Sequence, residues 1–220
     1  MKRIVLLALI VIGTFAASCK FGHHNGVRGS GNRKTETRDL KSFKAIDTSG
    51  AYEINLNCQK PASFEIEGDD NILPLIKTEV RDGILFVTSD QSINPSRALR
   101  LRINLPELVE VTSRGAGEIT VTDANSESLK LESLGAAKID ATGKAKSVNI
   151  SSTGAGKIDT SGLITEKASV NVTGAASVDV YASEQLDVTV AGAGSVQYTG
   201  NPKTVNKHVS GIGRVSSKTE

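Results

Sequence analysis

Apolar and polar residues alternate along much of the second half of the chain. The segments LKLES, SVNIS, ASVNVT and LDVTV carry apolar residues at every second position. Because successive side chains of a β-strand point to opposite faces, this alternation predicts short strands that bury one face. The pattern therefore indicates an all-β protein with an apolar interior and a polar surface.

A glycine-centred unit recurs between these strands at nearly constant intervals. In each copy a glycine is followed by Ala or Ile and then by Gly or Ala, and successive copies are 20, 19, 20, 18 and 19 residues apart. The leading glycines are Gly115, Gly135, Gly154, Gly174, Gly192 and Gly211, and Gly50 opens a related segment. A unit this short cannot fold alone, so the copies are expected to stack as a solenoid. At these corners Gly115 is expected to permit a backbone angle that a β-carbon would oppose.

Apolar residues also recur at fixed distances from each glycine, which predicts continuous columns in the core. The position four residues after the glycine is always Ile or Val, and the position four before it is apolar in every copy except the last, where it is Lys207. The spacing is too short for propeller blades, and the consensus of leucine-rich repeats is absent. The sequence therefore predicts a right-handed parallel β-helix with coils of about 19–20 residues.

The first half follows this repeat less regularly. Ile54 and Leu56 keep the apolar offsets from Gly50, and the segments FEIE, TEVRDGILFV and LRLRINL read as further strands. The pair Asp82-Gly83 predicts a hairpin turn, and GDDNILPLIK predicts a turn and an irregular crossing. The 65 residues from Gly50 to Gly115 correspond to about three coils and an insertion.

The amino terminus has the pattern of an export signal. Two basic residues precede an apolar run, Ile4 to Ile12, that is too short to span a bilayer. Small residues at 16–18 then precede Cys19, as in bacterial lipoproteins. We expect residues 1–18 to be a signal peptide and Cys19 to carry lipid that holds the protein on a membrane. A secretory signal followed by an incidental cysteine is the alternative.

The rest of the chain fits a tether and one domain. Residues 19–35 are rich in Gly, Asn, Ser and basic residues, which predicts a flexible tether after the lipidated cysteine. Residues 36–220 are then a single β-helix domain. If Cys19 is lipidated, Cys58 has no partner within the chain, so the fold depends on its core rather than on disulfides.

Charge and aromatic content argue against nucleic-acid binding. Removal of the signal leaves 24 basic residues against 24 acidic ones, and aromatic residues are only 4% of the chain. The glycine-rich units also lack a phosphate-binding signature, because Gly156-Lys157 is followed by Ile158 rather than by Ser or Thr. We therefore expect neither a nucleic-acid partner nor a cofactor.

Several phrases resemble a known family. The segments KTETRDLKSFKAIDTSGAYEINL and IEGDDNILPLI, with the recurring Gly-Ala-Gly units, are similar to the putative auto-transporter adhesin, head GIN domain family of Bacteroidetes-type envelope proteins. The resemblance covers about residues 36–216 and implies a β-helix. It implies no catalytic residues.

One outward column is the main candidate for chemistry. Asp140, Asp159 and Asp179 each lie five residues after a repeat glycine, so stacked coils would place them about 5 Å apart. Such carboxylates are candidates for calcium binding, for glycan contact, or for sugar cleavage. Alternatively, Lys138 and Lys157 lie two residues before aspartates on the same face and neutralise them in solvent.

These observations lead to two hypotheses about function. The first is a non-catalytic, exported lipoprotein, placed in the outer membrane, that forms an adhesin-like or structural scaffold and contacts glycans or other envelope or host-surface components. The second is a polysaccharide-binding or polysaccharide-cleaving protein that uses Asp140, Asp159 and Asp179. Converging carboxylates in a concave groove on that face would favour the second, and Lys–Asp pairs on a flat face the first. The side of the membrane and the oligomeric state stay open, since the last coil is a sheet edge that only polar residues and Lys207 protect.

Overall fold

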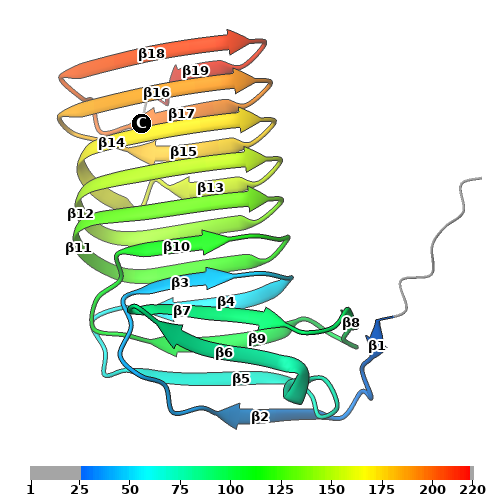
Figure 1. Cartoon of the computed structure of the whole chain (residues 1–220). Coiled ribbons are helices and arrows are strands. Elements are labelled where there is room, and N and C mark those ends of the chain that lie inside the picture. Colours follow the sequence, from blue (N-terminus) through cyan, green and yellow to red (C-terminus); the bar gives the residue numbers. More distant parts are fainter. Residues whose placement is uncertain (1–25, 219–220) are drawn as a thin grey trace, which may run out of the picture.

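The computed structural model describes residues 26–218, and strands stacked along one axis make up most of them (Figure 1). The expected signal peptide, Cys19 and the first part of the expected tether lie outside these residues. Between residues 26 and 218, no helix is long and apolar enough to cross a membrane.

Residues 26–218 contain nineteen strands and one short 3-10 helix. In chain order they are β1 (Val27–Arg28), β2 (Arg33–Thr37), β3 (Ala45–Thr48), β4 (Tyr52–Asn57), β5 (Ser63–Asp69), η1 (Leu73–Leu75), β6 (Ile76–Arg81), β7 (Ile84–Ser89), β8 (Ile93–Asn94), β9 (Leu99–Asn104), β10 (Glu110–Ser113), β11 (Glu118–Gly135), β12 (Lys138–Gly154), β13 (Lys157–Thr160), β14 (Leu163–Gly174), β15 (Ser177–Tyr181), β16 (Gln185–Gly192), β17 (Ser195–Thr199), β18 (Thr204–Gly211) and β19 (Arg214–Ser217).

The strands from β10 to β19 form a parallel β-helix, as the sequence predicts, in a solenoid of about five turns. In Figure 1 the nearer strands run to the right and the farther ones return to the left while the chain climbs, so the coil is right-handed. Each coil pairs with the next in the register set by the repeat: Ile119 pairs with Ile139, and Ile139 with Ile158. The repeat in the sequence is therefore the repeat of the solenoid.

The predicted apolar columns form the core. The column that follows the glycines is at most 1% exposed from Ile119 to Val196, and the column that precedes them is at most 2% exposed from Val111 to Val188. Each buried Ile, Val or Leu side chain contributes about 2 kcal/mol by leaving water. Because the columns run from coil to coil, they make one continuous core rather than separate cores for each unit.

The glycines stack where the chain turns from one face of the solenoid to the other. Several of them have a positive φ, between 113° and 139°, but Gly115 and Gly135 do not. The expectation that Gly115 is needed for its backbone angle is therefore wrong. A β-carbon on Gly115 would lie 2.1 Å from the carbonyl oxygen of Gly50, and one on Gly135 would lie 2.4 Å from that of Gly115. We call the stacked glycines Gly50, Gly115, Gly135, Gly154, Gly174, Gly192 and Gly211 the glycine ladder. The six from Gly115 onward share a close approach to the neighbouring coil, because a β-carbon on each would lie 2.1–2.7 Å from the carbonyl oxygen of the preceding ladder glycine. A β-carbon on Gly50 would instead meet the side chain of Tyr52.

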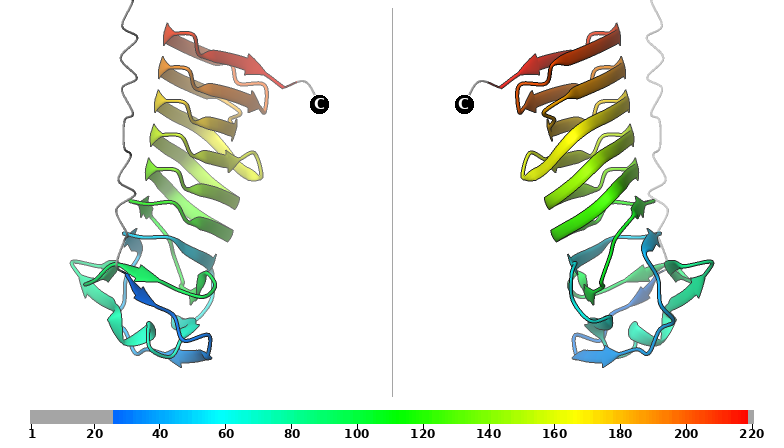
Figure 2. Two further views of the ribbon diagram at one scale, coloured as in Figure 1. Left: turned by 90° about the vertical axis from the view of Figure 1, so that its right-hand side faces the viewer. Right: turned by 90° about the vertical axis from the view of Figure 1, so that its left-hand side faces the viewer.

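The first half of the chain folds at one end of the solenoid in an order that differs from the sequence. Strand β4 pairs in parallel with β11 on one side and with β9 on the other, and β3 likewise lies between β10 and β7. Gly50 and Gly115 therefore belong to adjacent coils, and the expectation of about three coils between them is wrong. The intervening strands lie beyond the coil of β3 and β4, at the end opposite β18 and β19 (Figure 2).

Antiparallel strands lie beyond the parallel coils at this end. Strand β5 pairs with β9 and β2 pairs with β5, so β2 is the outermost strand. The pair Asp82-Gly83 forms the expected hairpin turn between the antiparallel strands β6 and β7, and both residues have positive φ. The expected irregular crossing at GDDNILPLIK contains η1. The N-terminal end thus has its own topology, which the repeat does not predict.

Residues 26–35, which we expected to belong to a flexible tether, are part of the fold. Strand β1 pairs with β8, and the buried carboxylate of Asp69 accepts hydrogen bonds from the backbone N–H of Gly31 at 2.9 Å and from that of Ser96 at 2.8 Å. Asn71 donates to the carbonyl of Arg28 at 2.8 Å. Polar groups of the Asp69–Asn71 turn hold this segment in place. Its sequence therefore has few apolar residues that would indicate an ordered part of the fold.

Substitution in the glycine ladder tests why glycine is required. We expect Gly135→Ala to lower the free energy of unfolding by about 3 kcal/mol, because the new methyl group must displace the Gly115 backbone. Gly83→Ala is the matched control: its φ is +75°, and nothing lies within 4 Å of the added carbon, so only a backbone cost of about 1 kcal/mol is expected. Denaturant unfolding followed by circular dichroism measures both, and equal losses would contradict the close-approach explanation.

The Asp69 turn predicts a pH-dependent stability. Burial alone would raise the pKa of Asp69, but hydrogen bonds from Ser96 and Gly31 and the charge of Arg33 hold it below its usual value. A depressed folded pKa stabilises the fold above a pH of about 4, and this stabilisation is lost as the pH falls further. We expect Asp69→Asn to destabilise the protein at pH 7 and the difference from the parent to shrink toward pH 2. The control is Asp70→Asn, because the Asp70 carboxylate accepts a hydrogen bond from the Ser30 hydroxyl. If Asp69→Asn lost the same free energy of unfolding at every pH, the prediction would be refuted.

Candidate functional site

The three aspartates singled out in the sequence lie in one column, on β12, β13 and β15. Asp140 pairs with Asp159, and Asp159 pairs with Asp179, in successive coils. Their side chains are between 20% and 32% exposed, so they face solvent without being fully hydrated. The predicted alignment of these residues is therefore present.

Lysine side chains lie between the carboxylates. The Lys138 ammonium is 2.7 Å from Asp140 Oδ2 and 2.7 Å from Glu118 Oε1. The Lys157 ammonium is 3.6 Å from Asp159 Oδ2 and 3.7 Å from Asp179 Oδ2, so it bridges two coils. The hydrogen bonds to Asp140 and Glu118 raise the pKa of Lys138, which keeps this ammonium group charged. We call this surface, Glu118, Lys138, Asp140, Lys157, Asp159 and Asp179, the ion-pair face.

Asp159, in the middle of the aspartate column, lacks the electrostatics of a catalytic acid. A glycosidase acid needs a carboxyl group whose pKa is raised. Burial acts in that direction on Asp159, but hydrogen bonds from Ser161 and the charge of Lys157 lower its pKa below the usual value. A calcium ion at these aspartates would have to displace ammonium groups that are already in place. Within residues 26–218, His, Cys, Asp and Glu side chains form no group of three or more that could hold a metal ion.

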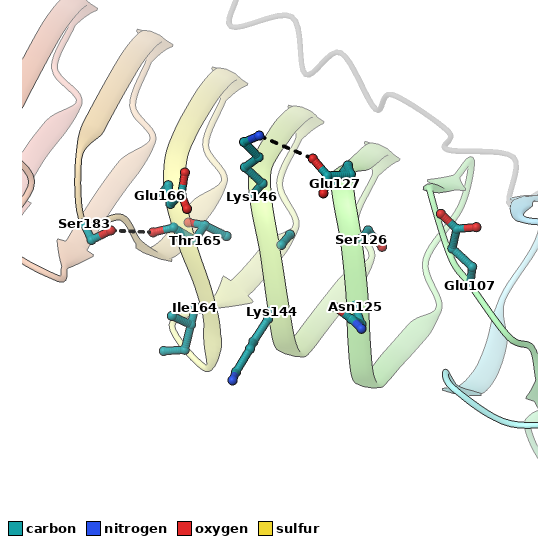
Figure 3. Close-up of a pocket in the computed structure, with 11 residues that line it drawn as sticks. Glu107, Asn125, Ser126, Glu127, Lys144, Lys146, Ile164, Thr165, Glu166 and Ser183 are labelled. Atoms are coloured by element: carbon teal, nitrogen blue, oxygen red, sulfur yellow. Dashed lines mark hydrogen bonds and ion pairs between the residues drawn. The ribbon is translucent and has the colours of Figure 1, made fainter.

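A second polar surface lies where the strands bend, across the solenoid from the glycine ladder. It is a groove of about 690 Å³ that crosses β11, β12 and β14 (Figure 3). Two rows of outward side chains border it, and small buried residues lie between them. One row is Asn125, Lys144 and Ile164, the other is Glu127, Lys146 and Glu166, and Ser126, Ala145 and Thr165 lie between.

The groove can make hydrogen bonds and ion pairs. Ser126 and Thr165 donate their hydroxyl protons to backbone carbonyls of the solenoid, so neither is poised as a nucleophile. Lys146 pairs with Glu127 at 3.5 Å, and Ile164 remains 47% exposed. Neither His nor Cys lines the groove. Sequence alone does not reveal this surface, because its residues come from segments such as TDANSES and TGKAKS, which are largely polar and contain few apolar residues.

The other reactive side chains lie away from both surfaces. Cys58 is a buried thiol, and burial together with the charge of Asp123 raises its pKa to about 11, which keeps it protonated and unreactive. His208 is exposed on β18. Cys19, the expected lipid attachment site, lies outside the described residues.

Comparison with known structures gives the same architecture. A protein from Bacteroides fragilis described as a putative adhesin is 23% identical, with a TM-score of 0.73 over 88% of this chain and 100% of its own. A putative lipid binding protein from Parabacteroides distasonis is 18% identical, with a TM-score of 0.56 over 88% of this chain and 99% of its own. A putative adhesin from Parabacteroides merdae is 19% identical, with a TM-score of 0.52 and the same coverage. At these identities the likeness shows the fold alone.

The family comparison is more specific. No protein of curated function matches the chain. The model of one family matches residues 42–202, which contain most of the glycine ladder and the whole ion-pair face. The chain therefore belongs to the family described as putative auto-transporter adhesin, head GIN domain.

Proposed function

We propose that the protein is a non-catalytic, exported scaffold of the bacterial cell envelope that contacts its partners through polar rows on a rigid solenoid. The observation that carries the proposal is the ion-pair face, where Lys138 and Lys157 neutralise the stacked carboxylates instead of leaving an acid and a base apart. Membership of an adhesin-type family supports a binding role and a location outside the cytoplasm.

Repetition is the basis of the proposed binding mechanism. Coils about 4.8 Å apart present similar polar groups again and again, so an extended partner can make many equivalent contacts. Each contact is weak because it is exposed to water, and the contacts add because the partner is held at the first of them. The continuous core keeps the rows in place before binding, which lowers the ordering cost. Glycans and other envelope or host-surface components are the proposed partners.

Attachment to the membrane through Cys19 is part of the proposal. The small residues before Cys19 and the apolar run before them support cleavage at this position and lipidation of the new amino terminus. Several acyl chains on one residue would hold the protein durably, since each buried CH2 contributes about 0.8 kcal/mol. The outer membrane is the proposed location.

Metabolic labelling tests the anchor. Cells that express the full chain are grown with an alkyne fatty acid, and we expect the protein to incorporate it and to fractionate with membranes. Cys19→Ser should abolish both, because no acyl acceptor remains. Cys58→Ser is the matched control and should keep the label, since this thiol is buried in the core. Labelling that survives Cys19→Ser would exclude the proposed anchor.

A binding and cleavage assay tests the scaffold. We expect the mature protein, purified in mild detergent, to be retained on glycan arrays and to release no new reducing ends from the glycans it binds. Asp159→Asn should weaken retention by removing an acceptor from the ion-pair face. Asp187→Asn, on β16 at the opposite face, is the control. New reducing ends that disappear in Asp159→Asn would instead support the polysaccharide-cleaving hypothesis.

A further inference from the structure

The last coil of the solenoid has an open edge. Strand β18 pairs with β16 on one side, and within residues 26–218 no strand pairs with its other side. Strand β19 likewise pairs with β17 alone in this part of the chain. The opposite end differs, because antiparallel strands lie beyond its last parallel coil. An eight-residue edge of this kind is a template for another strand.

The backbone groups available on β18 can be identified from its hydrogen bonds. Thr204 donates its N–H to Glu184, and Ile212, just after the strand, donates to Gly192, both at 3.0 Å. In a parallel pair only alternate residues direct their N–H and C=O groups toward the same neighbour. The N–H and C=O groups of Val205, Lys207 and Val209 therefore point away from β16, toward the position of a missing strand.

The side chains of these same residues continue the core columns. Val205 lies in register with Leu186, Lys207 with Val188, and Val209 with Val190. Unlike the Leu and Val residues beneath them, none of the three is fully buried: Val205 is half-buried, and Val209 is 41% exposed. Ile212, at the adjacent corner, is 88% exposed. The edge thus offers hydrogen-bonding groups and apolar surface together.

Lys207 gives the edge a specific charge. Its ammonium group lies 4.7 Å from the centre of the Tyr198 ring and 3.2 Å from the Tyr198 hydroxyl. In the part of the chain that the structure describes, no carboxylate lies within ion-pair distance of it. A positive charge between two valines, with no acidic partner, favours an acidic residue at the opposite position of a strand that pairs with β18.

We propose that this edge binds an extended segment of another protein in which an acidic residue lies between two apolar residues, each two positions away. The segment would add to β18 as a new outermost strand, with the acid opposite Lys207 and the apolar residues opposite Val205 and Val209. The order Val205, Lys207, Val209 is apolar–basic–apolar in either direction along the strand. The required pattern is therefore the same for parallel and antiparallel addition.

A second copy of the chain fits this edge less well. Antiparallel pairing of two β18 strands about a two-fold axis would match Val205 with Val209, but the same register places Lys207 opposite Lys207. Like charges directly opposite one another destabilise a strand pair. Lys207 thus disfavours self-association while favouring an acidic partner.

Fluorescence anisotropy with labelled peptides tests the proposal on the mature protein in detergent. The probe is Thr-Val-Thr-Glu-Thr-Val-Thr, and the comparison peptide carries Lys in place of Glu. We expect the Glu peptide to bind at least about tenfold more tightly, which corresponds to about 1.4 kcal/mol between opposite and like charge. Lys207→Glu should reverse this preference. Lys207→Gln should bring the two affinities within about twofold, and it keeps the test decisive if Lys207→Glu does not fold.

Lys203→Glu is the matched control. Lys203 is exposed in the loop before β18, 3.8 Å from Glu184, so the same change of charge there should leave the preference for the Glu peptide intact. Failure of the Glu peptide to bind, equal affinity for both peptides, or an unchanged preference in Lys207→Glu would each overturn the proposal. Sedimentation of the parent as a dimer that Val209→Arg dissociates would show that a second copy occupies the edge, and would overturn it as well.

Discussion

Close approach of backbone to backbone at the glycine ladder is the constraint on which the rest of the structure depends. Where Gly135 meets Gly115, a single added carbon would lie 2.4 Å from a carbonyl oxygen. The same corner carries a hydrogen bond from one coil to the next, as when Ala136 donates to the Gly115 carbonyl at 3.0 Å. The corners thus fix both the spacing and the register of the coils. Once the register is fixed, every column of side chains follows from it.

In that register, equivalent residues of successive coils stack on one another, and the consequence in the core is opposite to that on the surface. Inside, Ile119, Ile139 and Ile158 stack and exclude water. Outside, the same rule brings aspartates into adjacent coils, where their charges repel. The lysines two residues earlier relieve this repulsion, because a side chain as long as that of Lys157 reaches carboxylates in two coils. The polar surface is therefore a product of the repeat and not evidence of an active centre.

The sequence was sufficient for the parts of the fold that the repeat controls. The offsets of Ile54 and Leu56 from Gly50 correctly placed β4 among the coils, since these residues pair with Ile119 and Val121. The order of coils at the N-terminal end could not be predicted, because β3 and β4 pair with β10 and β11 across five intervening strands, and a pairing so distant in sequence leaves no local pattern. The groove at Lys144 and Ile164 was missed for a related reason: its residues come together only after strands from three coils bend at the same place.

A repeating scaffold is distinctive mainly at its ends. Along its sides each coil offers nearly what its neighbour offers, so contacts there add up in strength but discriminate little between partners. At the ends the repeat stops, and single residues decide what can follow. Beyond β3 and β4, the parallel strands β9 and β7 pair with the antiparallel strands β5 and β6. At β18, Lys207 occupies a column that is otherwise apolar, beside a backbone that can accept another strand. Strength along the faces and selectivity at the edge are therefore separable, because different residues on different surfaces would produce them.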